Sequence, residues 1–168
     1  MMVSVPDVDW SMTLVDLLNT TPVIDGVAHD LLGSDADAHA WLAGHGADGT
    51  EDPQRVRCLR DDLQAVVRGQ ADAAVLDAHL GGYVRRPRVD ATGVHWVMQP
   101  DPDWIARIML VWGDVQQRNP GRLRPCGNPD CRLFLLDRTR AGTARWCSMS
   151  VCGNRMKARR HYSRTTGR

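Results

Sequence analysis

The sequence has little of what a membrane protein or a well-known class of enzyme needs. Its 168 residues contain no apolar run that approaches the roughly twenty residues of a membrane-spanning helix, and no basic segment followed by an apolar stretch opens the chain. It also lacks the serine elbow of α/β-hydrolases, the phosphate-binding loop of nucleotide hydrolases and the two-histidine zinc motif of metalloproteases. We therefore expect a soluble, cytoplasmic protein without a membrane partner, and we favour a non-enzymatic role.

Cysteine is scarce, yet four of the five cysteines form two close pairs. Cys126 and Cys131 have four residues between them, Cys147 and Cys152 also have four, and fifteen residues separate the pairs. Two such pairs can bring four thiolates to one tetrahedral centre, which suits a structural Zn²⁺, one per chain. Two disulfides would use the same residues, but they suit oxidising compartments and would leave Cys58 unpaired. An iron–sulfur cluster also takes four thiolates, although ferredoxin spacings differ from this one.

The residues around the two pairs predict a small treble-clef-like module. Glycine and proline inside the first pair favour a tight ligand-bearing loop. Between the pairs, residues 133–136 and 143–146 are expected to form a hairpin with a turn at residues 139–142. Good helix formers after Cys152 predict a helix whose first turn carries the last ligand. So small a module has too little core to fold without its metal, so loss of zinc should unfold it and leave the rest of the chain largely intact.

Three stretches carry a resemblance to a known family. Residues 145–155 resemble the signature of the CGNR zinc finger family, and residues 126–131 are similar to its first cysteine pair. Residues 14–20 resemble the opening motif of the ABATE domain, which precedes this finger in family members. The resemblance implies an ABATE-like domain at residues 1–120 and a zinc finger at residues 121–168, in a bacterial stress-induced transcription regulator. It also implies structural zinc on the four cysteines and suggests RNA binding for relatives.

The chain before the finger predicts a mainly helical α+β domain. Polar caps and helical apolar spacing favour helices at residues 9–20, 34–43, 52–67, 71–80 and 103–118. Alternating segments at residues 83–89 and 94–99 flank a four-residue connection and predict a small β-hairpin, whereas residues 26–33 are expected to form a loop. Cys58 is expected to be half-buried beside a helical apolar stripe.

Tryptophan is the most common aromatic residue of this domain. We expect Trp10, Trp41, Trp96, Trp104 and Trp112 to belong to the core, although together they could also line an apolar pocket. The sequence alone does not decide which of them share a surface.

Charge is distributed unevenly along the chain. Residues 1–120 contain nine Arg against eighteen Asp and Glu, a net charge of −9, whereas residues 121–168 contain twelve Arg and Lys against two Asp, a net charge of +10. Such an asymmetry indicates an anionic partner for the basic end. The candidate phosphate contacts are Arg145, Arg155, Lys157, Arg159, Arg160 and Arg164. Phe134 and Tyr162 are candidates for stacking on unpaired bases, while Trp146 is expected to shield the zinc.

These features favour a nucleic-acid-binding transcriptional regulator with duplex DNA as its partner. One alternative is a zinc-stabilised module that binds a ligand, an acidic protein or RNA, and another is an enzyme with its site in the N-terminal domain. A small-molecule effector in that domain and a homodimer also stay open. The opposite charges of the two halves suggest a further hypothesis, in which the acidic domain competes with nucleic acid for the basic finger.

Overall fold

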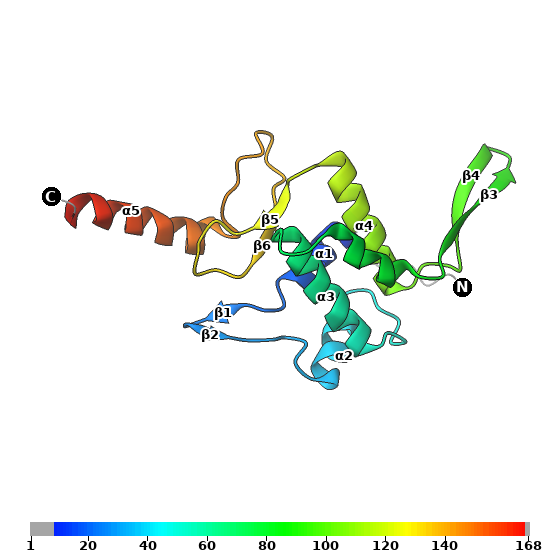
Figure 1. The fold of residues 1–168 in the computed structure, drawn as a ribbon, viewed down its shortest axis with the longest axis horizontal. Helices are drawn as coiled ribbons and strands as arrows, with labels where there is room; N and C mark the ends of the chain where they lie inside the picture. Colours follow the sequence, from blue (N-terminus) through cyan, green and yellow to red (C-terminus); the bar gives the residue numbers. More distant parts are fainter. Residues whose placement is uncertain (1–8, 167–168) are drawn as a thin grey trace.

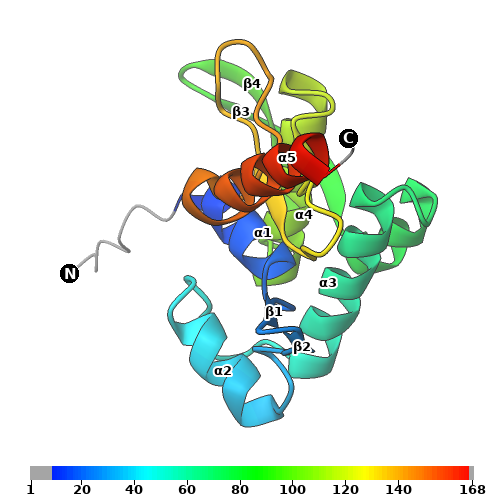
Figure 2. The ribbon, with the colours of Figure 1, turned by 90° about the vertical axis from the view of Figure 1, so that its left-hand side faces the viewer.

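The computed structural model describes residues 9–166 and places a small helical body between two projecting elements (Figures 1 and 2). Residues 1–8, on which the prediction about a leader segment falls, lie outside the described range, as do residues 167–168. The helices are α1 (Trp10–Leu18), α2 (Asp35–Ala43), α3 (Pro53–Val67), the 3-10 helix η1 (Ala73–Leu80), α4 (Trp104–Arg118), the wide helical turn η2 (Met149–Gly153) and α5 (Asn154–Thr166). The strands form antiparallel pairs: β1 (Val23–Ile24) with β2 (Val27–Ala28), β3 (Val84–Asp90) with β4 (Gly93–Gln99), and β5 (Leu123–Pro125) with β6 (Phe134–Leu136). No described helix is both long and apolar enough to cross a membrane.

The main helices start where their polar caps predict. Asp9, Ser34, Asp52 and Asp103 each accept a hydrogen bond from a backbone N–H in the first turn of α1, α2, α3 and α4. Each cap satisfies a donor that has no partner inside its helix. The α+β fold class, with a mainly helical N-terminal part and a small hairpin, is confirmed.

The helical body, from α1 to α4, encloses one core to which the C-terminal strands also contribute. Leu14, Leu17 and Leu18 of α1 are fully buried among residues of α3 and α4, and Leu123 and Phe134 belong to the same cluster. Phe134 is 1 % exposed and its backbone is held by Asn19, whose Oδ1 accepts from Phe134 N at 2.7 Å. The C-terminal module, from β5 to α5, therefore packs into the body through β5 and β6, and a division of the chain after residue 120 stays a prediction.

The predicted hairpin between the cysteine pairs does not form, so that prediction is wrong. Of residues 133–136, Phe134–Leu136 do form a strand, β6. It pairs with β5, which precedes the first cysteine, in the register Leu123 to Leu136. Residues 143–146 are irregular because side chains bind their backbone. Arg124 donates to the Ala144 carbonyl oxygen and the Asp137 carboxylate accepts from Ala144 N at 2.9 Å.

Two further details differ from the sequence prediction. Residues 26–33 were expected to form a loop, yet β1 and β2 form a short hairpin whose turn places Asp25 and Gly26 at φ of 51° and 80°. Positive φ at both positions is what an Asp-Gly hairpin turn requires, so the signal was present. The β3–β4 connection is also shorter than four residues, because Asp90 pairs directly with Gly93.

Cys58 is exposed, not half-buried. Its helix buries Val56, Leu59 and Leu63, and Cys58 lies about 100° around the helix axis from Leu59, which is enough to leave the buried stripe. Its sulfur accepts a hydrogen bond from Gln54 Nε2 at 3.6 Å. Within residues 9–166, no hydrogen bond joins this sulfur to a basic group that could activate the thiol.

Candidate metal centre

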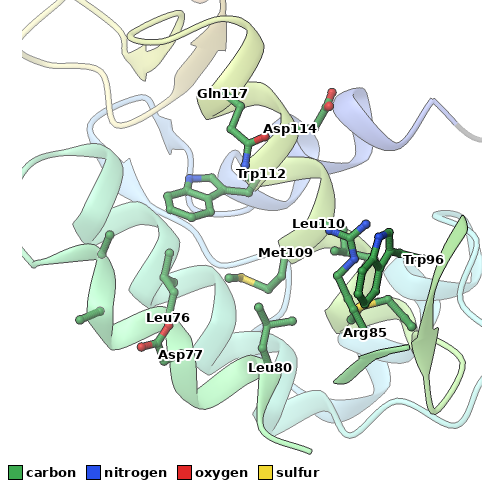
Figure 3. Close-up of a pocket in the computed structure, with 14 residues that line it drawn as sticks. Leu76, Asp77, Leu80, Arg85, Trp96, Met109, Leu110, Trp112, Asp114 and Gln117 are labelled. Atoms are coloured by element: carbon green, nitrogen blue, oxygen red, sulfur yellow. The ribbon is translucent and has the colours of Figure 1, made fainter. Parts of the chain in front are cut away.

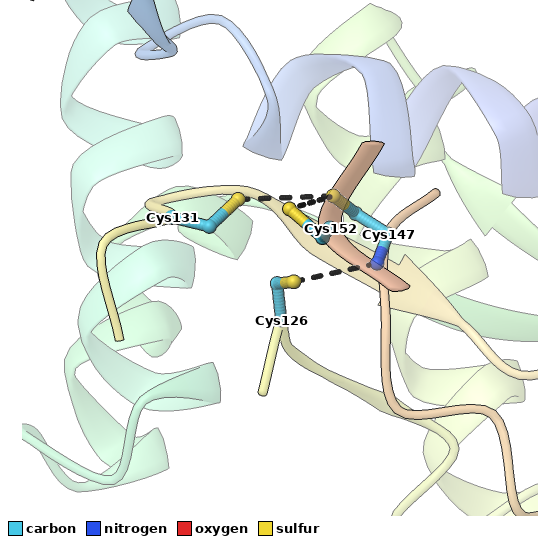
Figure 4. A group of neighbouring side chains, drawn as sticks. All are labelled: Cys126, Cys131, Cys147 and Cys152. Atoms are coloured by element: carbon cyan, nitrogen blue, oxygen red, sulfur yellow. Dashed lines mark hydrogen bonds between the residues drawn. The ribbon is translucent and has the colours of Figure 1, made fainter. Parts of the chain in front are cut away.

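The four paired cysteines converge on one point (Figure 4). Their sulfur atoms all lie within 4.8 Å of one another, and Cys147 Sγ is 3.7 Å from both Cys131 Sγ and Cys152 Sγ. A tetrahedral zinc with Zn–S bonds of about 2.3 Å places its sulfurs about 3.8 Å apart, which matches this separation. A disulfide needs an S–S distance of about 2.05 Å, so the disulfide alternative does not fit, and all four cysteines are free.

The loop after β5 presents the first two sulfurs. Cys126 N donates to the Leu133 carbonyl oxygen at 2.8 Å, which closes the loop onto the start of β6. Cys131 N donates to the Asn128 carbonyl oxygen at 2.9 Å, so the chain turns sharply between the two ligands. This turn places both sulfurs on one side of the loop.

Asn128 connects the first pair to the second. It is 1 % exposed, and its side-chain Nδ2 donates to Cys152 Sγ at 3.4 Å while its Oδ1 accepts from Asp130 N. A hydrogen bond of this kind stabilises the thiolate form of its acceptor and orients the ligand toward a metal. Sequence analysis missed this residue, because only the fold shows that its amide reaches the far ligand.

The second pair is held by the turn that precedes α5. Cys147 N donates to Cys126 Sγ at 3.4 Å, which gives a second thiolate a backbone donor. Ser148 caps η2 by accepting from Val151 N, and its carbonyl oxygen accepts from Gly153 N at 2.9 Å. The turn thus fixes Cys152 two residues before the start of α5 at Asn154.

Two glycines leave room for Trp146 beside the cysteines. A Cβ on Gly127 would lie 3.0 Å from the Arg145 carbonyl oxygen and 3.2 Å from the indole ring of Trp146. A Cβ on Gly153 would lie 2.9 Å from Met149 Sδ and 3.2 Å from the same indole. Because Gly127 and Gly153 adjoin Cys126 and Cys152, the indole packs next to both ends of the sulfur cluster, as a shield of the metal would.

The sulfur cluster is electrostatically suited to a divalent cation. Burial raises the pKa of Cys131 to about 11, and burial together with the neighbouring Cys131 and Cys126 thiolates raises that of Cys147 further. Although burial acts against it, hydrogen bonds from Asn128 and the neighbouring thiols lower the pKa of Cys152. Four crowded thiolates repel one another until a metal neutralises them, so the donor set fits Zn²⁺, and zinc binding would release protons.

The six candidate phosphate contacts are all exposed. Arg145 lies on the irregular segment before Cys147, with its guanidinium 5.7 Å from the centre of the Trp146 ring. The other five lie along α5, where Arg159 pairs with Asp130 at 2.9 Å. Phe134, a candidate for base stacking, is wrong for that role because it is buried in the core under the Arg68 guanidinium at 4.2 Å.

Comparison with known families accounts for nearly the whole chain. A family model described as "CGNR zinc finger" matches residues 122–165, and a model described as "ABATE: Putative stress-induced transcription regulator" matches residues 12–116. No curated protein matches the chain. The first match covers all four cysteines and all but the last residue of α5, and the second runs from within α1 to within α4 and includes the β3–β4 hairpin.

Proposed function

Because the chain belongs to the ABATE family and ends in a CGNR zinc finger that binds one structural zinc, we propose that it binds nucleic acid through α5 and regulates transcription on duplex DNA. In this proposal zinc supplies no chemistry of its own. The four cysteines hold it, and it fixes the turn from which α5 starts, so that the helix is presented in one orientation.

The observation that carries the proposal is the character of α5. The helix has five basic residues and no acidic one, and its described side chains are exposed apart from Met156. It contacts the rest of the described chain mainly through η2 and through the Arg159–Asp130 ion pair, and it extends away from the helical body (Figure 1). A helix of about thirteen residues is close to 20 Å long, which is enough to follow several phosphates of one strand.

Salt dependence distinguishes phosphate contacts from a merely solvated basic helix. With four to six phosphates neutralised, the logarithm of the affinity for duplex DNA should fall with the logarithm of salt concentration with a slope of about −4 to −5. Arg160→Ala with Arg164→Ala should flatten that slope by about one to two units, since neither residue has an ion-pair partner among the described residues. Fluorescence anisotropy of the zinc-loaded full chain at several salt concentrations measures both quantities.

A matched control uses two arginines elsewhere. Arg86→Ala with Arg88→Ala removes the same charge from the exposed β3 strand and should leave the slope unchanged. An equal loss in both double variants would mean that net charge alone attracts the DNA. Unchanged binding in the α5 variant would remove this helix from the interface. Tighter binding of RNA or single-stranded DNA than of duplex DNA would replace the proposed partner.

A further inference from the structure

The β3–β4 hairpin has one apolar face and one basic face. Its register pairs Pro87 with Trp96 and Val89 with Val94, so these side chains share a face, which Arg85 and Met98 continue toward the helical body. The opposite face carries Arg86, Arg88 and His95. The apolar face is poorly covered, because Trp96 is 58 % exposed and Val94 is 69 % exposed.

The hairpin is attached to the body mainly at its base. The Tyr83 hydroxyl accepts from Asp103 N at 3.3 Å, but the two strands have almost no backbone neighbours except each other, and Figure 1 shows them projecting beyond α4. A two-stranded hairpin alone is marginally stable in water. A molecule that filled the space under its apolar face would therefore stabilise it.

That space is a groove of about 690 Å³ between the hairpin, η1 and α4 (Figure 3). Its apolar walls are formed by side chains from all three elements, namely Leu76, Leu80, Trp96, Met98, Met109 and Trp112. The volume is within the range of small-molecule sites, which are mostly apolar with a few polar groups that fix the ligand's orientation.

Two polar groups near the groove have no partner among residues 9–166. The Trp112 indole nitrogen lacks a hydrogen bond in the described part of the chain, but neighbouring atoms cover it, so a ligand in the groove does not reach it. Arg85, on the hairpin side, pairs with no described carboxylate. Of the two acids at the rim, Asp114 pairs with Arg118 at 2.7 Å, and Asp77 lies beside Leu76, across the view of Figure 3 from Arg85.

We propose that this groove binds a small, mostly apolar ring compound that carries an acidic group, and that the hairpin closes over it. The ring packs between Trp96 of the hairpin and Met109 and Trp112 of α4. The acidic group pairs with Arg85. The site belongs to the ABATE domain and does not depend on nucleic-acid binding by α5.

Binding of 1-naphthoate to the zinc-loaded full chain tests the proposal by isothermal titration calorimetry. We expect saturable binding of one naphthoate per chain, tighter than binding of 1-naphthylmethylamine. Arg85→Gln should weaken it about two- to fivefold, whereas Arg86→Gln, on the opposite face of the same strand, should not. Trp96→Ala removes the aromatic wall that the hairpin contributes to the groove, and should weaken binding about three- to tenfold.

Amide hydrogen exchange supplies a second readout. Naphthoate should slow exchange across residues 84–99, because closure protects the hairpin, and should leave α5 unchanged. Tighter binding of the amine, or equal losses in the Arg85 and Arg86 variants, would overturn the proposed chemistry. A dimer whose hairpin is already protected without naphthoate would show that a second copy covers the groove, and absence of saturable binding would overturn the site itself.

Discussion

Asn128 links the two cysteine pairs through hydrogen bonds. Its side chain is buried and donates to Cys152 Sγ, while its backbone oxygen accepts from Cys131 N. A neutral donor to a thiolate lowers the electrostatic cost of crowding four sulfurs and fixes the orientation of one ligand before the metal binds. The spacing of the cysteines predicts the ligands, but it does not predict this support.

Asn128→Ala should therefore weaken zinc binding about tenfold, at the low end of what removal of a ligand's supporting hydrogen bond costs. Competition with a chromophoric chelator at pH 7 measures the change. Asn154→Ala is the matched control, since Asn154 Nδ2 donates to the Ser150 carbonyl oxygen and not to a sulfur. Equal zinc affinity in the Asn128 variant and the parent would show that the N–H···S contact contributes nothing to the site.

At the scale of elements, α1 and the C-terminal module meet at Asp9. This carboxylate caps α1 by accepting from Ser11 N and Met12 N, and it also pairs with Arg138 at 3.1 Å. Hydrogen bonding from Ser11, with Arg138 adding to it, lowers the pKa of Asp9 to about 2. Both Asp9 and Arg138 are about half exposed, so the pair itself is worth only about 0.2 to 1 kcal/mol.

The lowered pKa predicts a definite pH dependence. Asp9 stabilises the fold fully above its unfolded pKa of about 3.9, and the stabilisation is lost as the pH falls toward 2. Asp9→Asn keeps a capping oxygen but loses the charge, so the parent should be more stable near pH 6 and the difference should shrink below pH 4. Urea unfolding of both proteins across this range measures it, and zinc release on acidification is common to both. Asp25→Asn is the control, and a difference that stayed constant with pH would contradict the assignment.

Sequence signals next to each element predict most of the helices and strands. The remaining elements depend on contacts between residues that are far apart in the sequence. The starts of α1, α3 and α4 follow from Asp9, Asp52 and Asp103, because a cap and its helix are adjacent in sequence. The pairing of β5 with β6 could not be predicted in this way. It depends on Arg124 and Asp137 binding the segment that local pattern favours as a strand. The groove likewise depends on the hairpin register and on where η1 packs.

At the scale of the whole molecule, the basic helix and the acidic body are set apart. Figure 1 shows α5 extending away from α1 to α4, and its Arg159 pairs with Asp130 of its own module. Among the described residues, one ion pair joins the two halves, and it is formed by Arg138 and Asp9. Competition of the acidic surface with nucleic acid for α5 therefore stays a prediction. Because α5 extends away from its own helical body, such competition fits the acidic surface of a second copy better than that of the same chain.

Because the C-terminal module shares its core with the helical body, loss of zinc should destabilise both. A separate finger would unfold alone, but Leu123 and Phe134 lie in the same buried cluster as Leu14, Leu17 and Leu18. Since β5 and β6 are joined directly to the cysteine loop, unfolding of the metal site withdraws both residues from the core. Truncation of a buried phenylalanine costs about 3 to 5 kcal/mol, which is a large part of the stability of a domain of this size.

Chelation of zinc should therefore lower the melting temperature of the whole helical signal. Phe134→Ala should also lower this melting temperature in the zinc-loaded protein, while leaving the four ligands in place. Circular dichroism measures both melts, and elemental analysis measures the metal. Leu110→Ala is the control, because that side chain is 42 % exposed on α4 and should cost far less. If zinc-free protein kept the melting temperature of the loaded form, β5 and β6 would retain their packing without the metal, and the coupling between the zinc site and the core would be wrong.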